Sequence, residues 1–76
     1  MGHSSEILKD EELKLYWKYV ESMLRGCGCL PVDRIHTWLK LYANPEITIE
    51  QVKFLIDIKT KEQLLKYNAG LYRLNK

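Results

Sequence analysis

The chain has 76 residues, enough for one domain with a small core. Its hydrophobic content of 46% and charged content of 29% are typical of a globular protein and argue against a disordered segment. The net charge of +2 is too low for the dense basic stripe of a dedicated nucleic-acid-binding domain, and no apolar run approaches the roughly 18 residues of a membrane span. We therefore expect no membrane partner. Residues 1–5, Met-Gly-His-Ser-Ser, look like an expression-tag remnant, and we take residues 6–76 as the domain.

A first helix is predicted over residues 10–24. Asp10 suits the helix start, and Arg25 followed by Gly26 is a stop signal. Apolar residues recur at helical spacing and form one broad face that can pack on a core. These residues are Leu13, Trp17, Val20 and Leu24, flanked by Tyr16 and Met23.

The next four residues, 27–30, are expected to be a connector. Its two cysteines, Cys27 and Cys29, are separated by one glycine, and a disulfide between them would close a very tight ring. We therefore expect free thiols in a reducing compartment.

A second helix is predicted from Pro31 to about Ala43, since proline is tolerated at a helix start. Asn44-Pro45 ends it, because the residue before a proline resists the helical conformation. One face of this helix is apolar and carries a histidine. It consists of Val32, Ile35, His36 and Leu39, with Tyr42 near it.

A third helix has the clearest start, because Thr48 and Gln51 form a capping box. Its apolar stripe consists of Ile49, Val52, Leu55 and Ile56. From about Glu62 the pattern changes to alternation around Asn68-Ala69-Gly70, which is typical of a β-hairpin. The predicted fold is α+β and mainly α: a winged helix, that is, a three-helix bundle followed by a C-terminal hairpin wing.

The outer face of the third helix is the candidate binding surface. Phe54 and Ile58 are spaced i,i+4 on the side opposite the apolar stripe, so they are predicted to form one exposed patch. Charged residues flank this patch, namely Lys53, Asp57 and Lys61. The alternative is that Phe54 is structural and is covered by the wing or by the loop before the helix.

Metal binding and catalysis have little support in the sequence. A tetrahedral zinc site needs four ligands, whereas Cys27, Cys29 and His36 supply three, and the other histidine lies in the tag-like segment. His36 is expected to be a packed or boundary histidine. No nucleophile has a plausible base, and there is no glycine-rich phosphate loop. We expect no cofactor, no metal and no catalytic residue.

Three segments of the chain resemble one known family. They are residues 16–24 (YWKYVESML), residues 33–35 (DRI) and residues 67–74 (YNAGLYRL). They are similar to the C-terminal cullin-type winged-helix domain of subunit 2 of the anaphase-promoting complex, the cullin-like scaffold of that ubiquitin ligase. The resemblance runs from about Glu11 to Lys76, and in the third helix it is limited to the apolar spacing.

The resemblance implies a non-catalytic interaction module that acts in cell division, in the nucleus and cytoplasm. Its implied partners are the ubiquitin-conjugating enzyme, which it helps to recruit and position, and the RING subunit of the same ligase. Checkpoint inhibitor proteins are implied as competitors for the same neighbourhood. In ordinary cullins, a lysine near the end of the first helix accepts a ubiquitin-like modifier. Arg25 aligns with that lysine, and a guanidinium does not form the isopeptide bond.

DNA binding is the alternative reading from another functional class. Winged helices often place the third helix in the major groove and basic wing residues on phosphates. Five basic residues of the third helix and the wing are available, namely Lys53, Lys59, Lys61, Lys66 and Arg73. However, the outer face offers Phe54, Ile58 and Asp57 where Arg, Asn or Gln would read base edges.

Overall fold

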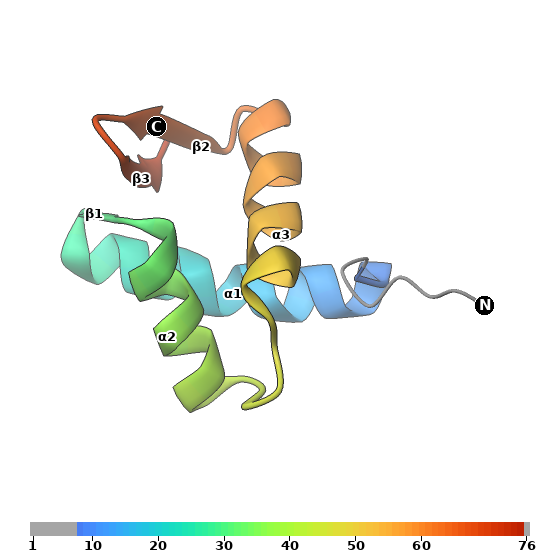
Figure 1. Ribbon diagram of the computed structural model, residues 1–76. Coiled ribbons are helices and arrows are strands. Elements are labelled where there is room, and N and C mark those ends of the chain that lie inside the picture. Colours follow the sequence, from blue (N-terminus) through green and yellow to red (C-terminus); the bar gives the residue numbers. More distant parts are fainter. Residues whose placement is uncertain (1–7, 76) are drawn as a thin grey trace.

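The computed structural model describes residues 8–75. The tag-like segment lies outside the described residues. The elements follow the order α1 (Asp10–Cys27), β1 (Cys29–Leu30), α2 (Val32–Tyr42), α3 (Ile49–Lys61), β2 (Leu65–Asn68) and β3 (Leu71–Leu74). Figure 1 shows three helices that cross one another, with the small sheet at one end of the bundle. The winged-helix prediction is confirmed. None of these helices combines the length and apolar character that a membrane span needs.

The first helix differs at both ends from the prediction. Lys9, not Asp10, occupies the N-cap position, and its backbone N–H donates to Oε1 of Glu12 at 3.1 Å. Gly26 does not stop the helix, which continues to Cys27. Gly28 ends it instead, because its φ of 88° is a conformation that favours glycine, and its N–H bonds the carbonyl oxygen of Leu24.

The wing is a three-stranded antiparallel sheet in the order β1-β3-β2. The predicted hairpin forms β2 and β3, and its turn has positive φ at both Ala69 (54°) and Gly70 (82°), as a type I′ turn requires. The sequence did not predict β1, which forms where a connector was expected. Cys29 pairs with Arg73 and Leu30 with Tyr72, so β3 is the central strand.

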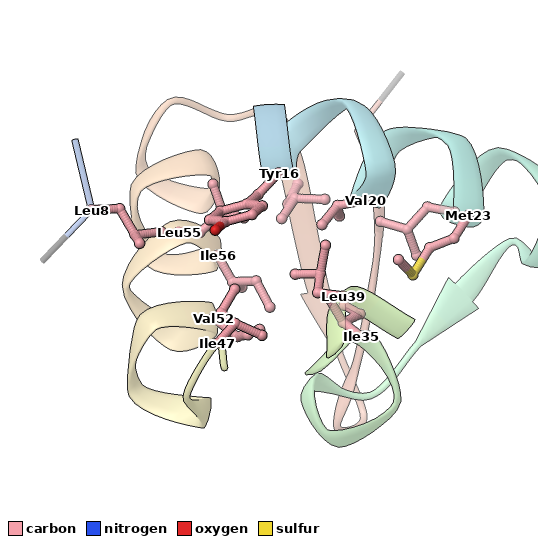
Figure 2. Packing of buried hydrophobic residues seen from close by; sticks show 12 residues of the cluster. Leu8, Tyr16, Val20, Met23, Ile35, Leu39, Ile47, Val52, Leu55 and Ile56 are labelled. Atoms are coloured by element: carbon pink, nitrogen blue, oxygen red, sulfur yellow. The ribbon is translucent and has the colours of Figure 1, made fainter. Parts of the chain in front are cut away.

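The core forms where the three helices meet. Figure 2 shows its side chains converging from α1, α2, α3 and the segments before α1 and α3. Trp17, expected on the core face of α1, is only half-buried, whereas Tyr16 beside it is buried. A hydrogen bond from Nδ2 of Asn44 to the Tyr16 hydroxyl accounts for the polar end of that buried side chain. The buried residues are Leu8, Tyr16, Val20, Met23, Leu24, Ile35, Leu39, Ile47, Val52, Leu55, Ile56 and Leu65.

Hydrogen bonds at two places hold the loop between α2 and α3 and the start of α3. The predicted capping box is present: the Thr48 hydroxyl accepts from the Gln51 N–H at 3.2 Å, and the Gln51 side chain accepts from the Thr48 N–H at 3.0 Å. The half-buried His36 lies with Nε2 at 2.9 Å from the Ile47 carbonyl oxygen. Because a carbonyl only accepts, Nε2 carries the proton. His36 is therefore a packed boundary histidine, as predicted.

Candidate partner-docking surface

A hollow of 560 Å³ lies between α3 and the wing. We call it the α3–wing hollow. Its lining comes from the start of α2, from one face of α3 and from both strands of the hairpin, so the fold brings together residues that are far apart in sequence. The lining residues are Val32, Lys53, Asp57, Thr60, Tyr67 and Tyr72.

Two tyrosines form the wing side of this hollow. Tyr67 and Tyr72 are cross-strand partners, and their ring centroids are 4.9 Å apart with the ring planes inclined at 51°. Tyr67 is exposed, whereas Tyr72 is half-buried. Burial raises the pKa of the Tyr72 hydroxyl, and the neighbouring Tyr67 and Asp57 raise it further. The Tyr72 hydroxyl therefore keeps its proton at neutral pH and is able to donate a hydrogen bond.

The α3 side of the hollow is polar. Lys53, Asp57 and Thr60 are spaced i, i+4 and i+7, so they share one face of the helix. The Thr60 hydroxyl donates to the carbonyl oxygen of Ile56 at 2.7 Å and is already engaged within the helix. Oδ2 of Asp57 pairs with Nζ of Lys61 at 3.2 Å, and exposed pairs of this kind hold side chains only weakly. Lys53 and Asp57 thus present one positive and one negative charge beside the tyrosine pair.

Two of the five residues predicted as the binding surface of α3 line the hollow, and the other three lie beside them on the helix. Lys53 and Asp57 line the hollow. Phe54 and Ile58 follow Lys53 and Asp57 by one residue, which turns them about 100° around the helix, whereas Lys61 lies one turn after Asp57 and pairs with it. The five predicted residues therefore occupy adjoining parts of the α3 surface, and the Asp57–Lys61 pair joins them.

Phe54 and Ile58 are exposed only in part, and for Phe54 the structural alternative applies to the buried part of the ring. Both side chains are half-buried, and Phe54 packs against the core cluster. A side chain as long as that of phenylalanine lies back along the helix surface, so part of its ring reaches the core from a position outside the main stripe. Sequence periodicity considers the direction of Cβ alone and misses this contact.

The basic residues proposed for DNA are spread over different surfaces. Lys59 is only 15% exposed and pairs with Glu62 at 3.4 Å, and Lys61 pairs with Asp57. Lys66 and Arg73 are cross-strand partners one register step from the tyrosine pair, so they lie on the opposite face of the wing from it. Lys53 lines the hollow. These five side chains do not form one stripe that could follow a phosphate backbone.

The sequence reasoning missed the wing side of the hollow. From the sequence, Tyr67 and Tyr72 belong only to the predicted hairpin, and Val32 belongs only to the apolar face of the second helix. Their pairing depends on the hairpin register, in which Tyr67 lies opposite Tyr72. The turn at Ala69 and Gly70 could have given that register, because two residues between the strands place those tyrosines opposite each other. In the described part of the chain, no group of three or more His, Cys, Asp or Glu could hold a metal ion.

Comparison with known proteins identifies the family. The family described as anaphase promoting complex (APC) subunit 2 matches residues 19–74. Anaphase-promoting complex subunit 2 of Homo sapiens is 37% identical over 73 residues, covering 90% of this chain. The protein of the same name from Schizosaccharomyces pombe is 30% identical over 67 residues, covering 83% of this chain.

The chain is much shorter than these relatives, since the alignments cover 9% of the human protein and 10% of the fission-yeast protein. The family match nevertheless covers most of the chain, including the C-terminal half of α1, all of α2 and α3, and the wing. The chain therefore belongs to the anaphase-promoting complex subunit 2 family.

Proposed function

We propose that this domain is a non-catalytic docking module of a ubiquitin ligase scaffold, which binds the ubiquitin-conjugating enzyme and helps to position it near the RING subunit. The observation that carries this proposal is the α3–wing hollow, where an aromatic pair lies beside one positive and one negative side chain. Tyrosine is enriched at the centres of protein interfaces, because it provides a large contact area and a hydrogen-bonding tip. Family membership makes a ligase component the natural partner.

The predicted residues of α3 have different roles in this proposal. Tyr67 and Tyr72 are the central anchors, with Lys53 and Asp57 orienting the partner at the rim. Ile58 and Lys61 extend the contact around the helix, and Phe54 contributes the exposed part of its ring. Checkpoint inhibitors that use the same hollow would compete with the conjugating enzyme. The proposed location of this activity is the nucleus and cytoplasm.

The proposal is tested by NMR titration of the isotope-labelled chain with the conjugating enzyme of the same ligase. The expected result is that the largest shifts fall on Lys53, Asp57, Tyr67 and Tyr72. Shifts confined to other surfaces, or none at all, would contradict the proposed surface.

Single substitutions then measure the energy of the contact. Tyr67→Ala is expected to weaken binding by at least about 1 kcal/mol, roughly fivefold, and to leave the melting temperature unchanged because Tyr67 is exposed. Ile58→Ala is expected to act in the same direction. Phe54→Ala is expected to lower stability as well, because Phe54 packs on the core. Lys14→Glu, on an exposed position of α1, is the control and should leave affinity unchanged.

The DNA-binding alternative is tested separately by retention on heparin at low salt. A wide basic surface would give affinity that falls steeply with salt concentration. The separation of the five basic side chains predicts weak retention with a shallow salt dependence. Strong, steeply salt-dependent retention that is lost in Lys66→Glu would instead favour nucleic acid.

A further inference from the structure

A second hollow, of 340 Å³, lies between the C-terminal half of α1 and α2, and we call it the α1–α2 groove. Its lining is almost entirely apolar or aromatic. Trp38 and Tyr42, one helical turn apart on α2, form one wall with ring centroids 4.9 Å apart and ring planes inclined at 37°. No residue that the structure describes lines both this groove and the α3–wing hollow. It is lined by Tyr19, Ser22, Met23, Gly26, Cys27, Trp38 and Tyr42.

The composition of the groove specifies what fits into it. Met23 is buried in the core, and its thioether is polarizable and adaptable, which suits the edge or face of an aromatic ring. Gly26 contributes no side chain, and a Cβ at that position would meet no atom within 4 Å, so this part of the groove is open. A cleft of this size, with aromatic walls, matches a bulky apolar side chain.

The groove continues along α1 into a smaller hollow of 210 Å³, lined by Leu15, Lys18, Tyr19 and Ser22. Lys18 is exposed, and among the described residues it is the one charged residue that lines the two hollows. Within residues 8–75, no carboxylate lines either of them. An occupant that fills both therefore needs an apolar anchor for the aromatic walls and a negative charge for Lys18, with the Ser22 hydroxyl available as a second donor.

We propose that the α1–α2 groove is a second docking site, which binds a short peptide segment carrying one bulky apolar side chain and a nearby Asp or Glu. The apolar side chain enters between Tyr19 and the Trp38–Tyr42 pair, and the carboxylate lies at Lys18. Binding by a few buried apolar anchors with a charged residue at the rim is a common mode of peptide recognition. This site goes beyond the proposed function, because it lies on other helices and needs none of the residues of the α3–wing hollow.

Selection of random dodecapeptides displayed on phage, with the immobilised 76-residue chain as bait, supplies the probe. The expected consensus contains Trp, Phe, Leu or Met together with Asp or Glu. The selected peptide should shift the Trp38 indole N–H and the Met23 methyl signals. Failure to select any peptide, a consensus without an acidic residue, or shifts confined to Tyr67 and Tyr72 would overturn the proposal.

Substitutions that keep the fold identify the site. A Cβ at position 26 meets no atom within 4 Å, so Gly26→Leu should place its side chain in the open part of the groove and abolish peptide binding, with an unchanged circular dichroism spectrum as the folding check. Lys18→Glu should weaken binding about fivefold or more, whereas Lys14→Glu, an exposed lysine on the same helix that lines neither hollow, should not. Equal loss in both lysine variants would indicate general charge attraction and would overturn the assignment of the carboxylate to Lys18.

Substitutions of two tyrosines with the same exposed fraction, one in each hollow, test the two docking sites separately. Tyr42 and Tyr67 are both 59% exposed. Tyr42→Ala should weaken peptide binding and leave the conjugating enzyme bound normally, and Tyr67→Ala should do the reverse. The two proposals therefore fail independently of each other.

The thiols provide a direct readout of occupancy. Cys27 lines the groove, whereas Cys29 lies in β1 outside it, and both thiols are free and exposed. The selected peptide should slow alkylation of Cys27 by iodoacetamide and leave the rate at Cys29 unchanged. Equal protection of both thiols would overturn the placement. A dimer that is seen in sedimentation and lost in Gly26→Leu would assign the groove to a second copy of the chain instead.

Discussion

The ammonium group of Lys59 lies 5.4 Å from the centroid of the Trp17 ring, so the end of α3 is joined to the middle of α1. The same ammonium is 3.4 Å from Oε1 of Glu62, and the Lys59 side chain is only 15% exposed. A cation over an indole contributes about 0.5–1 kcal/mol at exposed sites and more where water is excluded. Trp17 therefore contributes through its ring face as well as through the apolar area that it buries.

Trp17→Ala is expected to lower the free energy of unfolding by about 1–3 kcal/mol in chemical denaturation. A fully buried tryptophan would cost about 3–5 kcal/mol, but the half-buried ring loses less contact area. A double-mutant cycle with Trp17→Leu and Lys59→Met should give a coupling of about 0.5–1 kcal/mol. Additive effects would show that the cation and the ring do not interact in solution.

Two leucines on α2 make a matched pair for the core. Leu39 is fully buried, whereas Leu41 is 70% exposed. Leu39→Ala should cost about 2–5 kcal/mol, because it removes buried methyl groups and leaves a cavity. Leu41→Ala should change stability by less than about 0.5 kcal/mol. Similar losses in both variants, measured by urea denaturation, would show that α2 packs with another face toward the core.

The wing is expected to weaken at alkaline pH through Tyr72. Burial, together with Tyr67 and Asp57, raises the pKa of Tyr72 above 10.0 in the folded chain. The unfolded chain then ionises at lower pH, so this contribution to stability is intact below pH 10 and is lost as the pH rises through the folded pKa. Tyr72→Phe should make the fall in melting temperature above pH 10 shallower. Tyr42→Phe, on α2, is the control, and an equal change in both variants would assign the effect to tyrosines in general.

Because position 25 is an arginine, we expect that the enzymes that attach a ubiquitin-like protein to cullins do not modify the chain. Arg25 lies in the last turn of α1, exposed and 3.3 Å from a Glu21 carboxylate oxygen, where the resemblance to cullins places an acceptor lysine. Mass spectrometry after incubation with that enzyme cascade should detect no conjugate. A conjugate on a lysine of α1, such as Lys18, would contradict the expectation. Arg25→Lys tests whether the surrounding helix end is otherwise competent.

The sequence predicted best the helix ends and turns that are set by residues next to them in the chain. The third helix begins where Thr48 and Gln51 cap it, and the second ends before Asn44-Pro45. The hairpin turns at Ala69 and Gly70, within the turn that the sequence indicated. Caps, prolines and turn glycines act over three or four residues, so their effects can be read along the chain without knowledge of the fold.

Tertiary structure decided the features that depend on distant partners. The first helix continues past Gly26 to Gly28, directly before β1, and a strand of two residues exists only because β3 pairs with it. Long-range pairing of this kind leaves no periodic signal in so short a segment.

The candidate sites also depend on contacts between residues that are distant in the sequence. The start of the third helix and the apolar faces that α2 and α3 bury were determined by the sequence alone. The half-burial of Phe54, the tyrosine pair of the wing and the α1–α2 groove were decided by packing between elements. A hollow is made by side chains that meet from separate helices and strands, and only the folded chain sets the distances between them.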